Sequence, residues 1–386
     1  MEQHASRQFK ARRYLRSRLK SMRRGRNRGS RRRRPASTFV SLTGPAGNIG
    51  DALIRRESLG WALGTSTSLV VYAGNAPDVW LRQLGVPDDA VVLRSKRSVP
   101  RWLWMLATSP SRPVLMFEAG EVPLDRGNVL RELVFLAETV LVRVKSGVVV
   151  RPPRGIRAPT NPALWLHSLA ARLSQEALWR DAASAALARG GAIAPDIGFA
   201  VSPSPSGQER RELVVSLRGA RPLPGPAWMD AIRATAETAG LRIRTVVQVR
   251  EDEERARELA QALGGEFEPW GDTDAVQQEA NLRERYTGAR LVISDRMHVL
   301  VLSAIDGAVP AELVPSPTRK ITEAFATIGF HDISYDAQAS DSDGMRRFLE
   351  AQLKRTAEVG ERVDAARRRL TELESEMRAT VRTVRS

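Results

Sequence analysis

The chain has 386 residues, enough for two domains that each bury a core, and its 42% hydrophobic and 5% aromatic content is typical of a globular protein. It has no cysteine, which excludes disulfide bonds, thiolate nucleophiles and cysteine–zinc sites, and no apolar run approaches the ~20 residues of a membrane-spanning helix. The net charge of +16 is concentrated in residues 1–34, which carry +14 and leave the rest of the chain almost neutral.

The N-terminal 36 residues form a basic tail with too little apolar content to fold alone, so we expect disorder. Leu15, Leu19 and Met22 share one face at helical spacing, which would suit peripheral contact of residues 1–34 with an anionic membrane. A nucleic-acid arm and an Arg-rich targeting presequence are the less favoured alternatives. We therefore expect a cytoplasmic protein, either free or peripheral at the inner face of the membrane.

The next part of the chain alternates between strand and helix patterns. The predicted elements are strands at 39–43, 69–72, 114–117 and 148–150 and helices at 52–63, 128–144, 164–173 and 182–188. Pro152 and Pro153 are expected to stop the last strand. The Pro-Ser-Pro-Ser segment at 203–206 indicates a domain boundary.

The second half repeats the alternation. Its predicted strands are 213–217, 243–249, 290–294 and 311–314, and its predicted helices are 227–239, 253–263, 273–286, 297–305 and 320–328. Such alternation favours an α/β fold of two Rossmann-like domains with a cleft between them, at 37–205 and 206–335. Residues 343–386 are expected to form one long helix, whose apolar stripe (Val363, Ala366, Leu370, Leu373, Met377) favours packing on the body over a coiled coil.

The strongest candidate for a site follows the buried strand pattern at 290–294. Ser294, Arg296 and His298 come directly after its apolar residues, where a parallel strand delivers polar groups to a ligand. Arginine supplies a fixed cation and histidine a proton donor or acceptor near neutral pH. Of the four histidines, His298 has this placement. We therefore predict His298 and Arg296 as catalytic residues.

Two other strand ends carry candidate residues. The first strand runs into a glycine-rich turn with Asn48, Gly50 and Asp51 before a helix, which suits anion or acceptor contact, although Asp51 could simply cap the helix. Arg218 ends the first strand of the second half and would face the space between the domains. Arg180 and Asp181 are interpreted as structural, with Asp181 as a helix cap or as the partner of Arg180.

These motifs, in this order, resemble the polysaccharide pyruvyl transferase family over residues 38–330. The matching pieces are Gly47-Asn48-Ile49-Gly50-Asp51, Arg180-Asp181-Ala-Ala-Ser184, Pro195-Asp196, Val215-Ser216-Leu217-Arg218, Ser294-Asp295-Arg296-Met297-His298 and Arg319-Lys320. The resemblance implies a two-domain fold similar to GT-B glycosyltransferases. It also implies transfer of the enolpyruvyl group of phosphoenolpyruvate to a sugar hydroxyl pair, giving a pyruvate ketal in polysaccharide biosynthesis, with Arg218, Arg296 and His298 at the donor.

The expected chemistry follows from an anionic donor. Arg218, Lys320 and Ser294 would bind phosphoenolpyruvate as co-substrate, His298 would protonate it, and Asn48, Gly50 and Asp51 would contact the sugar acceptor, whose lipid linkage stays open. The scattered histidines predict no metal and no cofactor. Two alternatives remain, a GT-B-type nucleotide-sugar glycosyltransferase and a non-catalytic nucleic-acid or membrane-surface binding protein driven by the tail.

Overall fold

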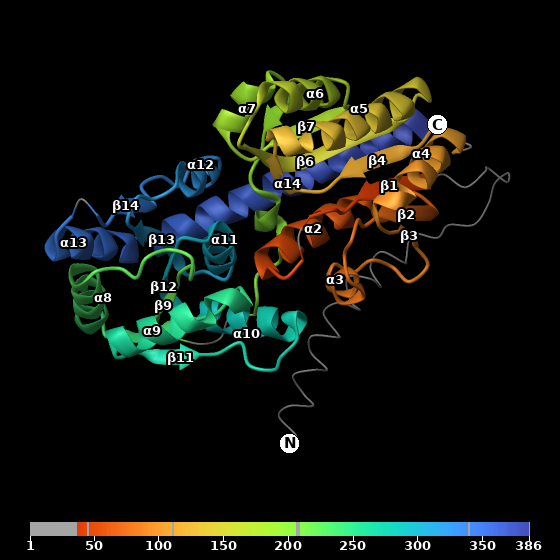
Figure 1. Cartoon of the computed structure of the whole chain (residues 1–386). Helices are drawn as coiled ribbons and strands as arrows, with labels where there is room; N and C mark the ends of the chain where they lie inside the picture. The colour runs from red at the N-terminus through yellow and green to blue at the C-terminus, as the bar shows by residue number, and fades with distance from the viewer. Residues whose placement is uncertain (1–36, 45, 110–111, 206–208, 339, 386) are drawn as a thin grey trace.

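The computed structural model describes residues 37–44, 46–109, 112–205, 209–338 and 340–385. Within them the chain folds into two α/β domains, each built on a parallel sheet, and a long C-terminal helix lies across both (Figure 1). The predicted fold class is therefore confirmed, while the basic tail lies outside the described residues. No helix in the described part of the chain combines the length and apolar content needed to cross a bilayer.

The N-terminal domain contains an eight-stranded sheet in the order β3-β2-β1-β4-β6-β7-β8, with β5 paired to β6. Its strands are β1 (Ser37–Ser41), β2 (Ser68–Tyr72), β3 (Val91–Leu93), β4 (Val114–Phe117), β5 (Gly120–Pro123), β6 (Val148–Arg157), β7 (Glu176–Trp179) and β8 (Ala192–Ile193). Its helices are α2 (Ile49–Ala62), α3 (Asp78–Gln83), α4 (Val99–Thr108), α5 (Val129–Val144), α6 (Asn161–Arg172) and α7 (Ala182–Ala188).

The C-terminal domain contains a six-stranded parallel sheet in the order β11-β10-β9-β12-β13-β14. Its strands are β9 (Glu212–Ser216), β10 (Arg242–Val246), β11 (Glu266–Glu268), β12 (Ala289–Ser294), β13 (Val309–Val314) and β14 (Ser334–Asp336). The helices are α8 (Pro226–Thr238), α9 (Glu253–Leu263), α10 (Ala275–Gly288), α11 (Met297–Ile305), α12 (Arg319–Ala326), α13 (Ser342–Leu353) and α14 (Thr356–Arg385).

The prediction that Pro152 and Pro153 stop the strand at 150 is wrong, because β6 continues to Arg157. The prolines lie at an irregularity between Arg151 and Arg154, where the register with β7 shifts. Before it β6 pairs with β4, and after it β6 pairs with β5. A proline is tolerated in a strand at such a point, because the ladder there does not use its missing N–H.

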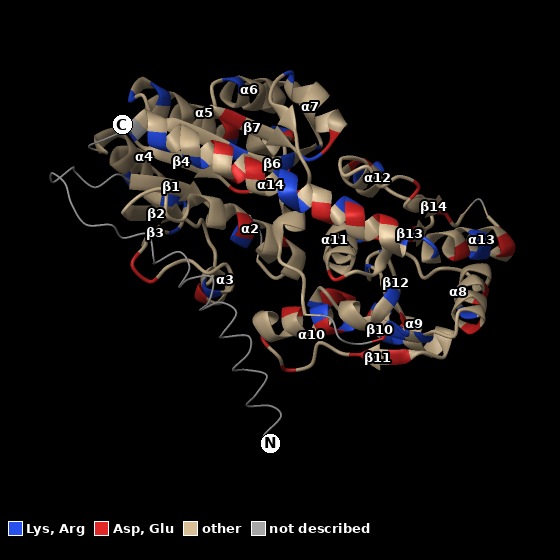
Figure 2. Cartoon of the chain, turned by 180° about the vertical axis from the view of Figure 1, so that it is seen from behind, with Lys and Arg blue, Asp and Glu red and all other residues tan. Residues whose placement is uncertain are grey.

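The single C-terminal helix of the prediction is two helices, α13 and α14, separated at Lys354–Arg355. Neither residue at the break is a glycine or proline, and the Arg355 guanidinium lies 3.8 Å from the centre of the Phe330 ring. All five residues of the apolar stripe of α14 are buried, which confirms that the helix packs on the body. Charged residues mark its outer side (Figure 2).

The two domains meet with the carboxyl ends of their strands facing one another. All strands of a parallel sheet end at the same edge, so the turns after β1 and β12 mark these edges. A Cβ atom built on Gly50, at the start of α2, would lie 2.4 Å from the His298 Cβ on α11. The apolar core is also continuous across this contact, since Leu42 and Ile49 belong to the same buried cluster as Val301.

Candidate functional site

Two helix N-termini meet at the domain interface. Asn48 caps α2, its Oδ1 accepting a hydrogen bond of 2.9 Å from the Gly50 N–H. Arg296 occupies the corresponding cap position of α11, and His298 follows within the first turn. The structure thus brings together the predicted residues Asn48, Gly50 and His298. Both helices place the positive end of their dipole here, which favours an anion.

His298 is buried, with 8% of its surface exposed, and among the described residues its one charged neighbour at ion-pair distance is Asp196. The His298 Nε2 lies 3.7 Å from the Asp196 Oδ2, which is too long for a hydrogen bond. Within the described residues this nitrogen has no hydrogen-bond partner. A buried polar atom of this kind normally has one, so the His298 Nε2 is left with an unused hydrogen-bonding position.

Asp196 is held as a buried carboxylate next to His298. Its Oδ1 accepts from the Gly198 N–H at 2.9 Å, and its Oδ2 accepts from the Arg180 Nη1 at 3.1 Å. Burial acts to raise the pKa of Asp196, but His298 and Arg180 outweigh it and hold that pKa well below its usual range. Asp196 therefore stays ionised and can stabilise an imidazolium at His298.

Arg180 has a different partner from the one considered in the sequence. Asp181 caps α7, its Oδ1 accepting from the Ser184 N–H at 2.6 Å, so the cap interpretation is confirmed. Arg180 instead contacts Asp196 and, at 3.2 Å, the Glu121 Oε1. A guanidinium that bridges two carboxylates positions Asp196 rather than meeting a ligand itself.

Lys320 completes this chain of charges from the other domain. Its Nζ lies 2.7 Å from the Glu121 Oε1. Burial, followed by the charges of Arg180 and Arg218, lowers the pKa of Lys320, although Glu121 opposes the shift. Burial thus disfavours the charged form of Lys320, while its ion pair with Glu121 favours that form.

Arg218 lies at the end of β9, where the sequence placed it, and is partly exposed. Its backbone N–H donates to the Asp295 Oδ1 at 3.1 Å, and its Nε lies 3.8 Å from the Asp295 Oδ2. Arg221 approaches the same oxygen at 3.2 Å. Burial raises the pKa of Asp295, and the two arginines offset only part of that shift. One carboxylate thus holds two arginines and leaves them positively charged overall.

Arg296 and Ser294 are engaged in contacts within the C-terminal domain. The Arg296 Nε donates to the Asp252 Oδ2 at 2.6 Å, and Asp252 also accepts from the Gly219 N–H at 2.9 Å. The Ser294 Oγ donates to the Ser216 carbonyl at 2.5 Å. These bonds fix the strand-end loops. Direct ligand contact by Arg296 and Ser294 stays a prediction.

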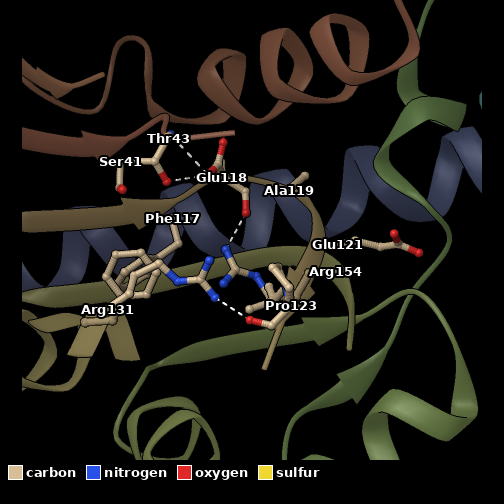
Figure 3. A pocket seen from close by; sticks show the side chains of 11 residues that line it. Ser41, Thr43, Phe117, Glu118, Ala119, Glu121, Pro123, Arg131 and Arg154 are labelled. Atoms are coloured by element: carbon tan, nitrogen blue, oxygen red, sulfur yellow. Dashed lines mark hydrogen bonds between the residues drawn. The ribbon is translucent and has the colours of Figure 1, made fainter. Parts of the chain in front are cut away.

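The glycine-rich turn after β1 is held by Glu118, as Figure 3 shows. This carboxylate accepts from the Thr43 N–H and Oγ1 at 3.1 and 2.9 Å, from the Gly44 N–H at 3.0 Å and from the Arg55 Nε at 2.7 Å. Asp51 lies 3.4 Å from the Arg55 Nη1 along α2. The cavity beside Glu118 has a volume of about 30 Å³, room for water rather than for a sugar.

Sequence reasoning gave Asp196, Asp252 and Glu118 no role in the site. Pro195-Asp196 is one of the motifs that carry the family resemblance, which is the one signal that could have identified Asp196. Asp252 and Glu118 gain their partners, Arg296 and Arg55, from elements distant in the sequence, so no local pattern marks them. Within the described residues, no group of three or more His, Asp or Glu side chains could hold a metal ion.

No family model matches the sequence, and no curated protein matches it. Solved structures do match in fold. HepE from Anabaena in complex with UDP aligns with a TM-score of 0.56 and 13% identity over 90% of this chain and 100% of that one. UDP-GlcNAc 2-epimerase from Neisseria meningitidis bound to UDP-GlcNAc aligns with a TM-score of 0.53 and 9% identity over 88% and 99%.

A third similar structure is the UDP-GlcNAc 2-epimerase from Methanocaldococcus jannaschii, with a TM-score of 0.51 and 11% identity over 82% of this chain and 92% of that one. These similarities confirm the GT-B-like fold. They also correct the expected function: the named structures are nucleotide-sugar proteins and none is a pyruvyl transferase, so the conclusion of enolpyruvyl transfer from phosphoenolpyruvate is wrong.

Proposed function

We propose that the chain is an enzyme that acts on a nucleoside-diphosphate sugar at the interface of its two domains. The first candidate reaction is transfer of the sugar to an acceptor hydroxyl, with His298 taking the proton of that hydroxyl. Arg218, Lys320 and the N-terminus of α11 hold the diphosphate, and Asp196 positions His298 and stabilises its charged form.

The observation that carries this proposal is the pairing of His298 with Asp196. The His298 Nε2 has no hydrogen-bond partner among the described residues and lies 3.7 Å from a carboxylate that stays ionised, which favours the protonated imidazole that a general base becomes. Attack by a hydroxyl on the sugar needs such a base, because the hydroxyl oxygen becomes a better nucleophile as its proton leaves. Arg180 supports the pair by fixing Asp196.

The second requirement is a place for the leaving diphosphate. Arg218 is partly exposed and lies at a strand end, and Lys320 is close enough for its pKa to be lowered by the charge of Arg218. Two phosphates could accept hydrogen bonds from these cations and from the N–H groups at the start of α11. These groups would then stabilise the negative charge that develops on the leaving diphosphate as its bond to the sugar breaks.

The fold similarity supports a nucleotide sugar as the ligand, since similar structures contain UDP, UDP and glucose, or UDP-GlcNAc. It also supplies a second candidate. Several of these structures are UDP-GlcNAc 2-epimerases, so inversion of a sugar centre by the same base is the alternative to transfer. Identity of 9–13% supports the fold alone, so the choice of residues rests on the geometry.

The test incubates the full chain with a panel of UDP-, GDP-, ADP- and dTDP-sugars, with and without sugar acceptors. Release of nucleoside diphosphate, a mass increase on the acceptor, and a new sugar epimer by proton NMR distinguish transfer from epimerisation. His298→Ala should abolish either product while the fold is kept, and His331→Ala, an exposed histidine far along the chain, is the matched control. The proposal would be overturned if the enzyme converted none of the nucleotide sugars in the panel.

A further inference from the structure

Helix α5 carries an apolar stripe on its outer side. Its inner side is buried against the sheet through Phe135, Thr139 and Val142. The outer side repeats apolar residues at alternating spacings of three and four, namely Leu130, Leu133, Ala137, Val140 and Val144, all of them exposed. A water-facing helix side normally carries polar residues, so this stripe calls for a partner.

The apolar side chains of the stripe are strongly exposed, and exposed apolar side chains are concentrated in the N-terminal domain. Leu130 and Val144 are 72% and 79% exposed, and Trp104 on the adjoining α4 is 65% exposed. Trp104 is two residues from the buried Trp102, so it points away from the sheet on a helical turn. Among the described residues, ten of the eleven exposed large hydrophobic side chains belong to the N-terminal domain and only Leu223 to the other.

The charges around the stripe have one sign. The exposed ionisable residues of the segments 96–109 and 126–147 are all basic: Lys96, Arg97, Arg101, Arg126 and Arg143. The acidic residues in these segments, Glu132 and Glu138, lie on the buried side of α5. None of the five basic residues has a carboxylate partner among the described residues. These five residues, the basic border, are the exposed charges of the two segments, and all five are cationic.

We propose that the α5 stripe, Trp104 and this basic border form a docking surface for an anionic lipid bilayer. Aliphatic side chains can enter the boundary of the acyl chains, and tryptophan favours the headgroup level. The basic residues would then meet anionic headgroups. The inference does not depend on the proposed activity.

Two other occupants fit the charges less well. In a two-fold dimer the same patch of both copies forms the interface, so the cationic borders of the two copies would come close together and repel. A nucleic acid would bind the cations but leave the aliphatic stripe facing water. The bilayer satisfies both features, and four exposed apolar residues larger than alanine on one helix supply the insertion.

The experiment uses the full chain and vesicles of phosphatidylcholine with or without phosphatidylglycerol. The basic tail can bind anionic vesicles by itself, so sedimentation alone is insufficient. Quenching of tryptophan fluorescence by brominated acyl chains reports insertion instead. We expect quenching of the wild type on anionic vesicles, persisting when salt screens the tail, and clearly less quenching of Trp104→Phe.

The double variant Leu133→Ser with Val140→Ser should lose this quenching and bind roughly tenfold more weakly at high salt. Val79→Ser with Leu223→Ser, which removes exposed apolar residues elsewhere, is the matched control and should behave as wild type. Equal quenching of wild type and Trp104→Phe, or unchanged binding of the stripe variant, would overturn the proposal. So would a dimer in light scattering that the stripe variant converts to a monomer.

Discussion

His298 and Asp196 come from different domains, yet the His298 Nε2 lies 3.7 Å from the Asp196 Oδ2. Asp196 follows the last strand of the N-terminal domain and directly precedes the 3-10 helix Ile197–Ala200. His298 lies in the first turn of α11 in the C-terminal domain. The pair therefore exists only when the domains are docked. The proposed activity should therefore depend on the arrangement of the domains, which makes the interface the place to test.

Asp196→Asn should remove the negative charge and keep the shape of the side chain. We expect kcat to fall roughly 10²- to 10⁴-fold with a smaller change in KM, because the amide cannot stabilise an imidazolium at His298. The measurement is steady-state nucleoside diphosphate release, with circular dichroism to confirm folding. Asp272→Asn, at an exposed position, is the control and should keep full activity. Wild-type kcat in Asp196→Asn would remove Asp196 from the mechanism.

Gly50→Ala should separate the two helix N-termini. The added Cβ would lie 2.4 Å from the His298 Cβ and 2.7 Å from the Gln248 Nε2, so the domains must shift apart. We expect loss of activity together with a lower melting temperature. Gly60→Ala, on the same helix with nothing within 4 Å, should instead gain up to about 0.5–1 kcal/mol in the free energy of unfolding. Equal behaviour of the two variants would contradict the contact.

Arg218→Lys and Lys320→Gln should weaken binding of the free nucleoside diphosphate. Lysine cannot reproduce the paired contacts of a guanidinium, and glutamine removes a cation, so we expect roughly tenfold or more in Kd from each, measured by calorimetry. The loss should shrink as salt rises. Arg319→Gln is the control, since Arg319 adjoins Lys320 in sequence but is almost fully exposed. Unchanged Kd in both site variants would move the diphosphate elsewhere.

Much of this fold could be predicted because strand and helix alternate with distinct periods. The strand Val114–Phe117 and the helices Glu253–Leu263 and Met297–Ile305 have the bounds that the sequence gives for them. Short edge strands such as Val91–Leu93 and Glu266–Glu268 were missed, because three residues carry no periodic signal. The break between α13 and α14 was missed because its residues, Lys354 and Arg355, include no glycine or proline to mark it.

The sequence could predict the positions of the candidate site residues but not which residues contact one another. A buried strand that ends in polar residues marks His298 and Arg218 locally, whereas the partners of Arg180 and Arg296 lie on other elements. The chemistry was less predictable still. Phosphoenolpyruvate and a nucleoside diphosphate are both phosphate anions, so the same arginines and helix ends suit either, and the motif alone misidentified the donor.

Glu138→Gln should change how stability depends on pH. Burial raises the pKa of Glu138 to about 8, although its hydrogen bond from the Trp102 Nε1 and the charge of Arg151 oppose the shift. The folded state thus holds a proton that the unfolded chain releases near 4.5. The contribution of Glu138 to the free energy of unfolding is therefore largest at low pH and should decline as the pH rises from about 5 to 8.

In Glu138→Gln this part of the decline should disappear, because an amide neither binds nor releases that proton. The measurement is the free energy of unfolding by urea from about pH 5 to 9. Glu251→Gln, at an exposed position, should follow the wild-type curve. A Glu138→Gln curve parallel to the wild type at every pH would show that Glu138 does not titrate in this range.

Leu370→Ala tests the role of α14 as a structural tie between the domains. Leu370 is buried, and further along α14 Arg378 donates to the carbonyls of Leu63 at 2.9 Å and Gly60 at 3.0 Å, at the end of α2. The truncation should cost about 2–5 kcal/mol in the free energy of unfolding, against little for the exposed Arg368→Ala.

Leu370 is not part of the contact between Gly50 and His298 at the start of α2. Leu370→Ala should therefore lower activity only in proportion to the loss of folded protein. Denaturant titration and activity measured on the same samples check this, and light scattering follows the oligomeric state. A cost below about 1 kcal/mol accompanied by loss of a dimer would mean that the stripe of α14 serves a coiled coil instead.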